Sequence, residues 1–88
     1  MKILIFASRD IEAYEQARVL ATRVGARFVD RLSGSLDDLR LVARYGVVEP
    51  VCIVVLRKDS LIARIPRLIT EAELHVDLRS LAEDGEVR

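Results

Sequence analysis

Residues 51–66 read VCIVVLRKDSLIARIP, and this stretch decides the fold. Its first six residues are the most apolar run in the chain and are rich in β-branched side chains, which is typical of a central β-strand. The polar turn RKDS at 57–60 separates them from a second apolar run, which Pro66 ends. Two short apolar runs around such a turn predict a β-hairpin.

Two strand–helix pairs are predicted before this hairpin. Residues 3–6 form a short continuous apolar run, which is typical of a strand buried on both faces. Apolar residues recur at helical spacing over residues 13–24, with Asp10 expected to cap that helix. Residues 27–32 are heavily charged, which favours an edge strand, and residues 35–45 again have helical spacing.

A third helix is expected after the hairpin, because TEAE at 70–73 forms a capping box. The predicted fold is therefore α/β with the order β-α-β-α-β-β-α, a mixed four-stranded sheet and helices on both faces. The first two strands should be parallel and joined by a right-handed crossover. A ferredoxin-like β-α-β-β-α-β order is the alternative, but it needs a hairpin where residues 35–45 have helical spacing. We expect one domain over residues 1–82 and a frayed tail at 83–88.

The composition excludes several functional classes. Eighty-eight residues, of which 51% are apolar, predict one globular domain and exclude intrinsic disorder. Fourteen basic and fourteen acidic side chains give no net charge, which argues against a nucleic-acid binder. No apolar run approaches the roughly 20 residues of a membrane span, and the apolar start is too short for a secretory signal. We therefore expect a cytoplasmic protein.

Metal and phosphate sites find little support in the sequence. Cys52 is the only cysteine, which excludes an internal disulfide and a multi-cysteine metal site. His75 is the only histidine and lies on a polar helical stripe, so no metal is expected. The four glycines are scattered and form no phosphate loop, and we expect no cofactor.

Several segments resemble the thioredoxin and glutaredoxin family. YGVVEPV at 45–51 is similar to the family segment in which YGV leads to a proline just before a buried strand. Residues 28–30 resemble the family's second strand, and residues 17–20 resemble part of its first helix. The resemblance spans residues 2–82 and implies a thioredoxin-like fold with a cis peptide bond before Pro50.

The redox motif of that family is missing. Matching the first helix places the two cysteines of Cys-x-x-Cys at Ile11 and Tyr14, and no cysteine lies in the first half of the chain. Without a thiolate there, a disulfide cannot be attacked, so dithiol oxidoreductase chemistry is excluded. Glu49 would put a carboxylate where the backbone of glutathione pairs in the family, which argues against glutathione binding.

We therefore expect a redox-inactive module that binds a protein partner or a second copy of itself, and no catalytic residue. The predicted binding groove consists of Ile11, Tyr14, Glu49 and Pro50. Self-association is predicted along the strand from Leu61 to Ile65, because an apolar edge strand can pair with a second copy.

Two alternatives stay open. One is an anion site at Ser8, Arg9 and Asp10, where free helix amides and a guanidinium would hold a small anion. The other is an enzyme of the single-thiol or glutathione-handling type that uses Cys52 near the Pro50 loop. A thiol buried among apolar side chains has a raised pKa and is inert, so the enzyme requires an exposed Cys52.

Overall fold

The computed structural model describes residues 1–32 and 35–87, with the side chains of residues 83–87 left out of the description. The elements in chain order are β1 (Lys2–Ala7), α1 (Ala13–Val24), β2 (Arg27–Asp30), α2 (Leu36–Tyr45), β3 (Val51–Arg57), β4 (Ser60–Ile65) and α3 (Glu71–Val87). This α/β order confirms the sequence prediction. The ferredoxin-like alternative is wrong, because residues 36–45 form a helix.

The four strands form one mixed sheet in the order β2-β1-β3-β4. Strands β1 and β2 are parallel, whereas β3 is antiparallel to both β1 and β4. These pairings confirm the predicted parallel pair and hairpin. The central places go to β1 and β3, which carry the most apolar sequences, and β2 and β4 are the edges.

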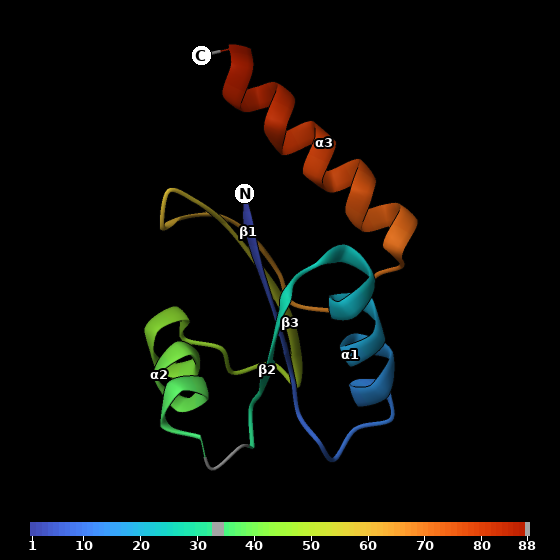
Figure 1. Ribbon diagram of the computed structural model, residues 1–88, viewed down its shortest axis with the longest axis vertical. Helices are drawn as coiled ribbons and strands as arrows, with labels where there is room; N and C mark the ends of the chain where they lie inside the picture. Colours follow the sequence, from blue (N-terminus) through green and yellow to red (C-terminus); the bar gives the residue numbers. More distant parts are fainter. Residues whose placement is uncertain (33–34, 88) are drawn as a thin grey trace.

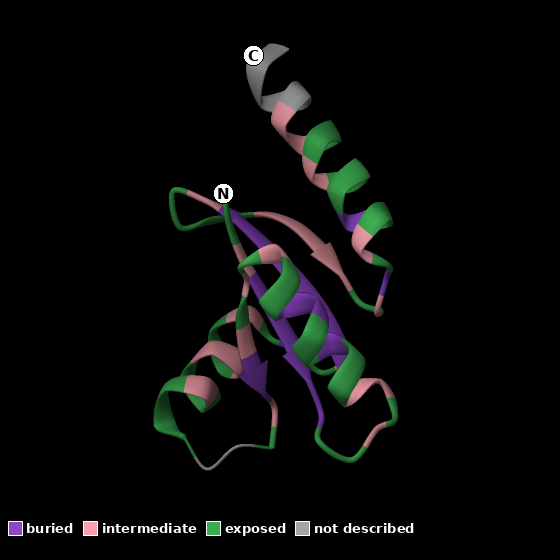
Figure 2. Ribbon diagram, turned by 45° about the vertical axis from the view of Figure 1, so that its right-hand side comes forward, coloured by how far each residue is buried: buried purple, intermediate pink, exposed green. Residues whose placement is uncertain are grey.

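Helices cover both faces of the sheet, with α1 and α3 on one side and α2 on the other (Figure 1). Alternate strand residues point to opposite faces. Ile5, Ile53 and Val55 pack with the buried side chains of α1 and α3, whereas Phe6 and Val54 face α2. The two central strands are buried along most of their length, and β4 is only partly covered (Figure 2).

Helix α1 begins later than predicted. Its N-cap is Glu12, which makes no side-chain cap bond, and Asp10 is exposed in the preceding turn. Backbone bonds from the Ile11 amide to the Ser8 carbonyl (3.3 Å) and from the Tyr14 amide to the Ile11 carbonyl (3.2 Å) form turns at this point. The predicted Asp10 cap is therefore wrong, because these turns delay the helix until residue 13.

Helix α3 starts at the predicted capping box. The Glu73 amide donates to Thr70 Oγ1, and the Thr70 amide donates to Glu73 Oε1, both at 3.1 Å. Leu74 is fully buried, whereas most of the helix beyond it is exposed or half-buried (Figure 2). The helix runs to Val87, through the segment predicted as a frayed tail.

Candidate functional site

Polar side chains gather where the parallel strands β1 and β2 end. Ser8 and Arg9 follow β1, Asp30 and Arg31 lie at the end of β2, and Tyr14 is in the first turn of α1. We call these five residues the strand-end cluster. Open α/β sheets bind ligands at the carboxyl ends of their parallel strands, so a binding site is expected at this end of the sheet.

The carboxylate of Asp30 is the centre of the strand-end cluster. Its Oδ2 accepts bonds from Arg9 Nη2 at 2.6 Å, Arg9 Nε at 3.1 Å and the Tyr14 hydroxyl at 3.2 Å. Its Oδ1 accepts the Leu32 amide at 2.9 Å. Burial by itself would raise the pKa of Asp30, but the bonds from Arg9, Leu32 and Tyr14 outweigh it, and the pKa is lowered. Asp30 therefore stays ionised, and both of its carboxylate oxygens accept hydrogen bonds.

Arg31 extends the cluster toward the Pro50 loop. Its Nη1 donates to Ser8 Oγ at 2.9 Å, and the Ser8 amide donates to the Pro50 carbonyl at 2.8 Å. Arg31 Nε is buried and has no hydrogen-bond partner among the described residues. These bonds connect β1, β2 and the Pro50 loop at one end of the sheet.

Two guanidinium groups lie at the predicted anion site of Ser8, Arg9 and Asp10, because Arg31 donates to Ser8 Oγ at 2.9 Å. Arg9 binds Asp30, so its charge is balanced by a carboxylate. Asp10 adds a second negative charge in the exposed turn beside it. The charges of Arg9 and Arg31 are matched by those of Asp30 and Asp10, which leaves an incoming anion little net attraction at these residues.

The four residues of the predicted groove point to different parts of the molecule. Tyr14 turns toward β2, where its ring meets Phe28 edge-on with centroids 5.3 Å apart. Glu49 turns toward β4, at the other edge of the sheet, and binds Arg64 at 2.6 Å. Ile11 packs against the core beneath α1, and Pro50 meets Ser8 through its backbone. The structure therefore brings Pro50 to the strand-end cluster but leaves Glu49 outside it.

The peptide bond between Glu49 and Pro50 is trans, which corrects the predicted cis bond. Trans is the default state of an X–Pro bond, by about 0.5–1 kcal/mol. The loop before it is held by Arg64, which donates to the carbonyls of Tyr45 at 2.6 Å and Gly46 at 3.1 Å. The cis isomer that the family resemblance implied is therefore absent at Pro50.

Cys52 is fully buried in β3. It faces α2 together with Phe6 and Val54, on the side of the sheet opposite α1. Burial raises the pKa of its thiol; the nearby charge of Arg64 lowers it and that of Glu49 raises it. The only thiol of the chain is therefore enclosed, protonated and separated from the start of α1 by the sheet.

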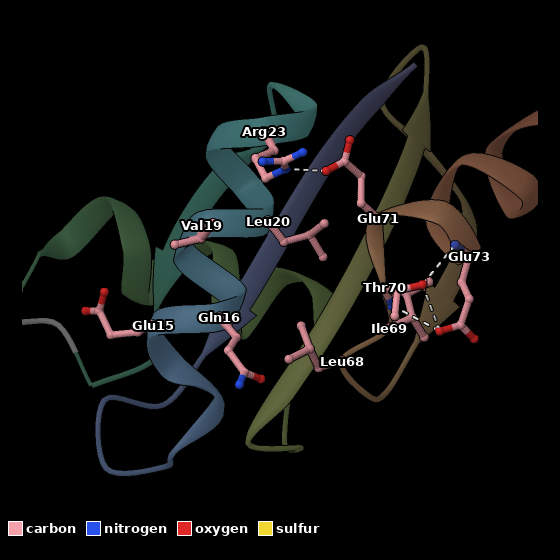
Figure 3. A pocket seen from close by; sticks show the side chains of 10 residues that line it. All are labelled: Glu15, Gln16, Val19, Leu20, Arg23, Leu68, Ile69, Thr70, Glu71 and Glu73. Carbon is pink, nitrogen blue, oxygen red and sulfur yellow. Dashed lines mark hydrogen bonds and ion pairs between the residues drawn. The ribbon is translucent and has the colours of Figure 1, made fainter.

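A cleft that the sequence analysis did not predict lies between α1 and the segment leading into α3 (Figure 3). Its volume is about 610 Å³, which is within the range of small-ligand sites. The residues that line it are Glu15, Gln16, Val19, Leu20, Arg23, Leu68, Ile69, Thr70, Glu71 and Glu73. The sequence feature that could have indicated this cleft is Val19, an apolar residue between Gln16 and Arg23 on the polar face of α1.

Within the described part of the chain, no three His, Cys, Asp or Glu side chains are grouped as metal ligands would be. His75 Nε2 lies 3.5 Å from Glu71 on the surface of α3. Among the same residues, no helix has the length and hydropathy that crossing a bilayer requires.

Comparisons with known proteins bear on the fold. No protein-family model matches the sequence, and no curated protein matches it. Among solved structures, thioredoxin 1 from the thermophilic eubacterium Thermosipho africanus TCF52B aligns over 98% of this chain and 99% of its own, with a TM-score of 0.65 and 16% identity. A thioredoxin-2, described as a component of the malaria parasite protein secretion machinery, aligns over 89% of this chain and 80% of its own, with a TM-score of 0.66 and 17% identity. These similarities establish a thioredoxin-like fold.

Proposed function

We propose that this thioredoxin-like domain is a binding and assembly module that performs no dithiol redox chemistry. The observation that carries the redox-inactive part of the proposal is the position of Cys52, fully buried in β3 on the face away from α1. Thiol–disulfide exchange needs an accessible thiolate, and burial keeps this thiol protonated.

The two positions where the family carries its cysteines support the same proposal. Ile11 packs against the core, and Tyr14 uses its hydroxyl to hold Asp30. Neither side chain can form a disulfide or a thiolate. The strand-end cluster thus replaces a reactive pair with an ion pair and a hydrogen bond, which hold the end of the sheet together.

Thiol labelling of the native protein tests this part of the proposal. We expect a disulfide reagent to leave wild-type Cys52 unmodified under native conditions and to modify it after unfolding in denaturant. Val48→Cys is the matched control, because Val48 is 76% exposed and its cysteine should react at once. Rapid native labelling of the wild type would overturn the proposal and favour a single-thiol enzyme.

We further propose that β4 supplies the assembly surface, by pairing antiparallel with β4 of a second copy. Edge strands that avoid such pairing carry charges, prolines or bulges. β4 has a register shift at Ile62, between its pairings with Val55 and Leu56, and Pro66 follows its end, but it has few charges. Between Leu61 and Ile65 the only charged residue is Arg64, which is engaged with Glu49 and the end of α2. Leu61 is half exposed, and a chain without net charge adds no repulsion between copies.

Light scattering over a wide concentration range tests the dimer. We expect the mass to rise from monomer to dimer in the wild type and to stay monomeric in Leu61→Lys, because a lysine on the edge opposes pairing. Val76→Lys is the control, since Val76 is also exposed but belongs to α3 and not to the paired edge, and this variant should still dimerise. A wild type that stays monomeric throughout would refute this surface.

A further inference from the structure

The cleft between α1 and the start of α3 has an apolar floor that is built into the core. Leu20 and Ile69 are almost fully buried, whereas Val19 is half exposed at its side. Gln16, Leu20 and Leu68 point into the space between α1 and the segment leading into α3 (Figure 3). Apolar floors of this kind attract an apolar group from a ligand, because its contact area leaves water on binding.

The walls of the cleft are fixed by contacts between distant residues. Arg23 Nε donates to Glu71, which ties the last turn of α1 to the first turn of α3. The reciprocal bonds between Thr70 and Glu73 hold the backbone of the opposite wall. A preformed cleft reduces the conformational entropy that a ligand must overcome when it binds.

The charged residues around the cleft favour a positively charged ligand. Three carboxylates, those of Glu15, Glu71 and Glu73, line it together with one guanidinium, that of Arg23. Arg23 already binds Glu71, and Glu15 binds Arg18 at 2.7 Å. Glu73 forms no ion pair with any residue that the structure describes, and its bonds to Thr70 use only Oε1. Glu73 Oε2 therefore accepts no hydrogen bond and forms no ion pair within the described residues, although Arg67 lies near enough for its charge to act on this carboxylate.

We propose that this cleft binds a segment of a protein partner in which an apolar side chain is followed by a lysine or arginine. The apolar side chain would lie over Leu20, Leu68 and Ile69, and the cation would meet Glu73. This inference rests on the proposed role as a binding module and adds the site and the chemistry of its partner. The surface is distinct from the β4 edge, so the two can be tested separately.

Amide NMR with two blocked tetrapeptides tests the inference: Leu-Lys-Leu-Lys and its acidic counterpart Leu-Glu-Leu-Glu. We expect the basic peptide to shift the amides of residues 15–23 and 68–73 in a saturable way and to bind more tightly than the acidic one. Glu73→Gln should weaken its binding about twofold to fivefold, the worth of one solvent-exposed ion pair. Gln keeps an oxygen for Thr70, so the capping box survives this substitution.

Val19→Ser tests the apolar part, and it should weaken binding by about threefold because it removes half-exposed apolar area from the cleft. Val48→Ser is the matched control, since Val48 is exposed in the loop before β3, and this variant should bind the peptide as the wild type does.

Equal affinity for the two peptides, absence of shifts at the cleft, or shifts confined to α2 or β4 would each overturn the inference. Cleft shifts that grow with protein concentration alone would point to a second copy as the occupant and would also overturn it. None of these outcomes changes the thiol labelling or the effect of Leu61→Lys, so a failure here is separable from a failure of the proposed function.

Discussion

Arg9 and Asp30 form an ion pair across the ends of two parallel strands, with Arg9 Nη2 2.6 Å from Asp30 Oδ2. They are 21 positions apart in the sequence, and the pair exists only because β1 and β2 end at the same edge of the sheet. Tyr14 adds its hydroxyl from α1 to the same oxygen. Three elements are thus joined through one carboxylate at one end of the sheet.

Removing the charge of Asp30 should destabilise the domain. Asp30→Asn keeps the shape of the side chain but loses the charge that binds Arg9, and bonds to charged groups contribute about 1.5–3 kcal/mol each. We expect urea unfolding at neutral pH to show a loss of about 2 kcal/mol in the free energy of unfolding. Asp77→Asn, on the exposed surface of α3, is the control and should change it little. Equal stabilities of the two variants would contradict this.

The same carboxylate should make stability depend on pH. The pKa of Asp30 is lower in the folded protein than its ordinary value of about 3.9. The stabilisation is therefore fully present above that value and is lost as the pH falls through it toward the lower pKa of the folded state. The difference in unfolding free energy between wild type and Asp30→Asn should shrink on acidification. A difference that stays constant from neutral to acid pH would show that the charge of Asp30 contributes nothing.

Arg64 should stabilise the end of α2. Its guanidinium donates to the carbonyls of Tyr45 and Gly46 and to Glu49 at 2.6 Å, so it satisfies groups that the helix leaves unpaired. Arg64→Met should lower the free energy of unfolding by about 1–2 kcal/mol, and Arg64→Lys should recover only part of it, because an ammonium lacks the planar fork. Arg79→Met is the exposed control. Full recovery by lysine would show that charge alone matters at this position.

The fold was largely predictable from the sequence because its signals are local. Apolar runs predicted β1 and β3, helical spacing predicted α1 and α2, and TEAE predicted the start of α3. The buried Cys52 followed from the same reasoning, since alternate residues of a central strand face a helix.

The site was less predictable because its contacts are not local. The family resemblance predicted that Tyr14 and Glu49 line one groove. Instead, Tyr14 contacts Phe28 and Asp30 at one edge of the sheet, and Glu49 binds Arg64 at the other. The cleft depends on Leu68 and Ile69 meeting α1 across a distance of about fifty residues, which periodicity alone does not reveal. Such surfaces depend on which distant side chains the fold brings into contact.

The environment of Cys52 predicts an order of stability among its variants. Its Sγ lies 4.0 Å from the carbonyl oxygen of Ile53, too far for a hydroxyl to form a good hydrogen bond. Cys52→Ala should cost about 1 kcal/mol for the small void, and Cys52→Ser should cost about 1–3 kcal/mol because it buries an unpaired hydroxyl. Urea unfolding should therefore rank wild type above alanine and alanine above serine. The proposed pairing of β4 does not use the thiol, so Cys52→Ala should behave as the wild type does in light scattering. A serine variant as stable as the wild type would mean that water or a partner group reaches this side chain, and the buried, inert thiol would have to be given up.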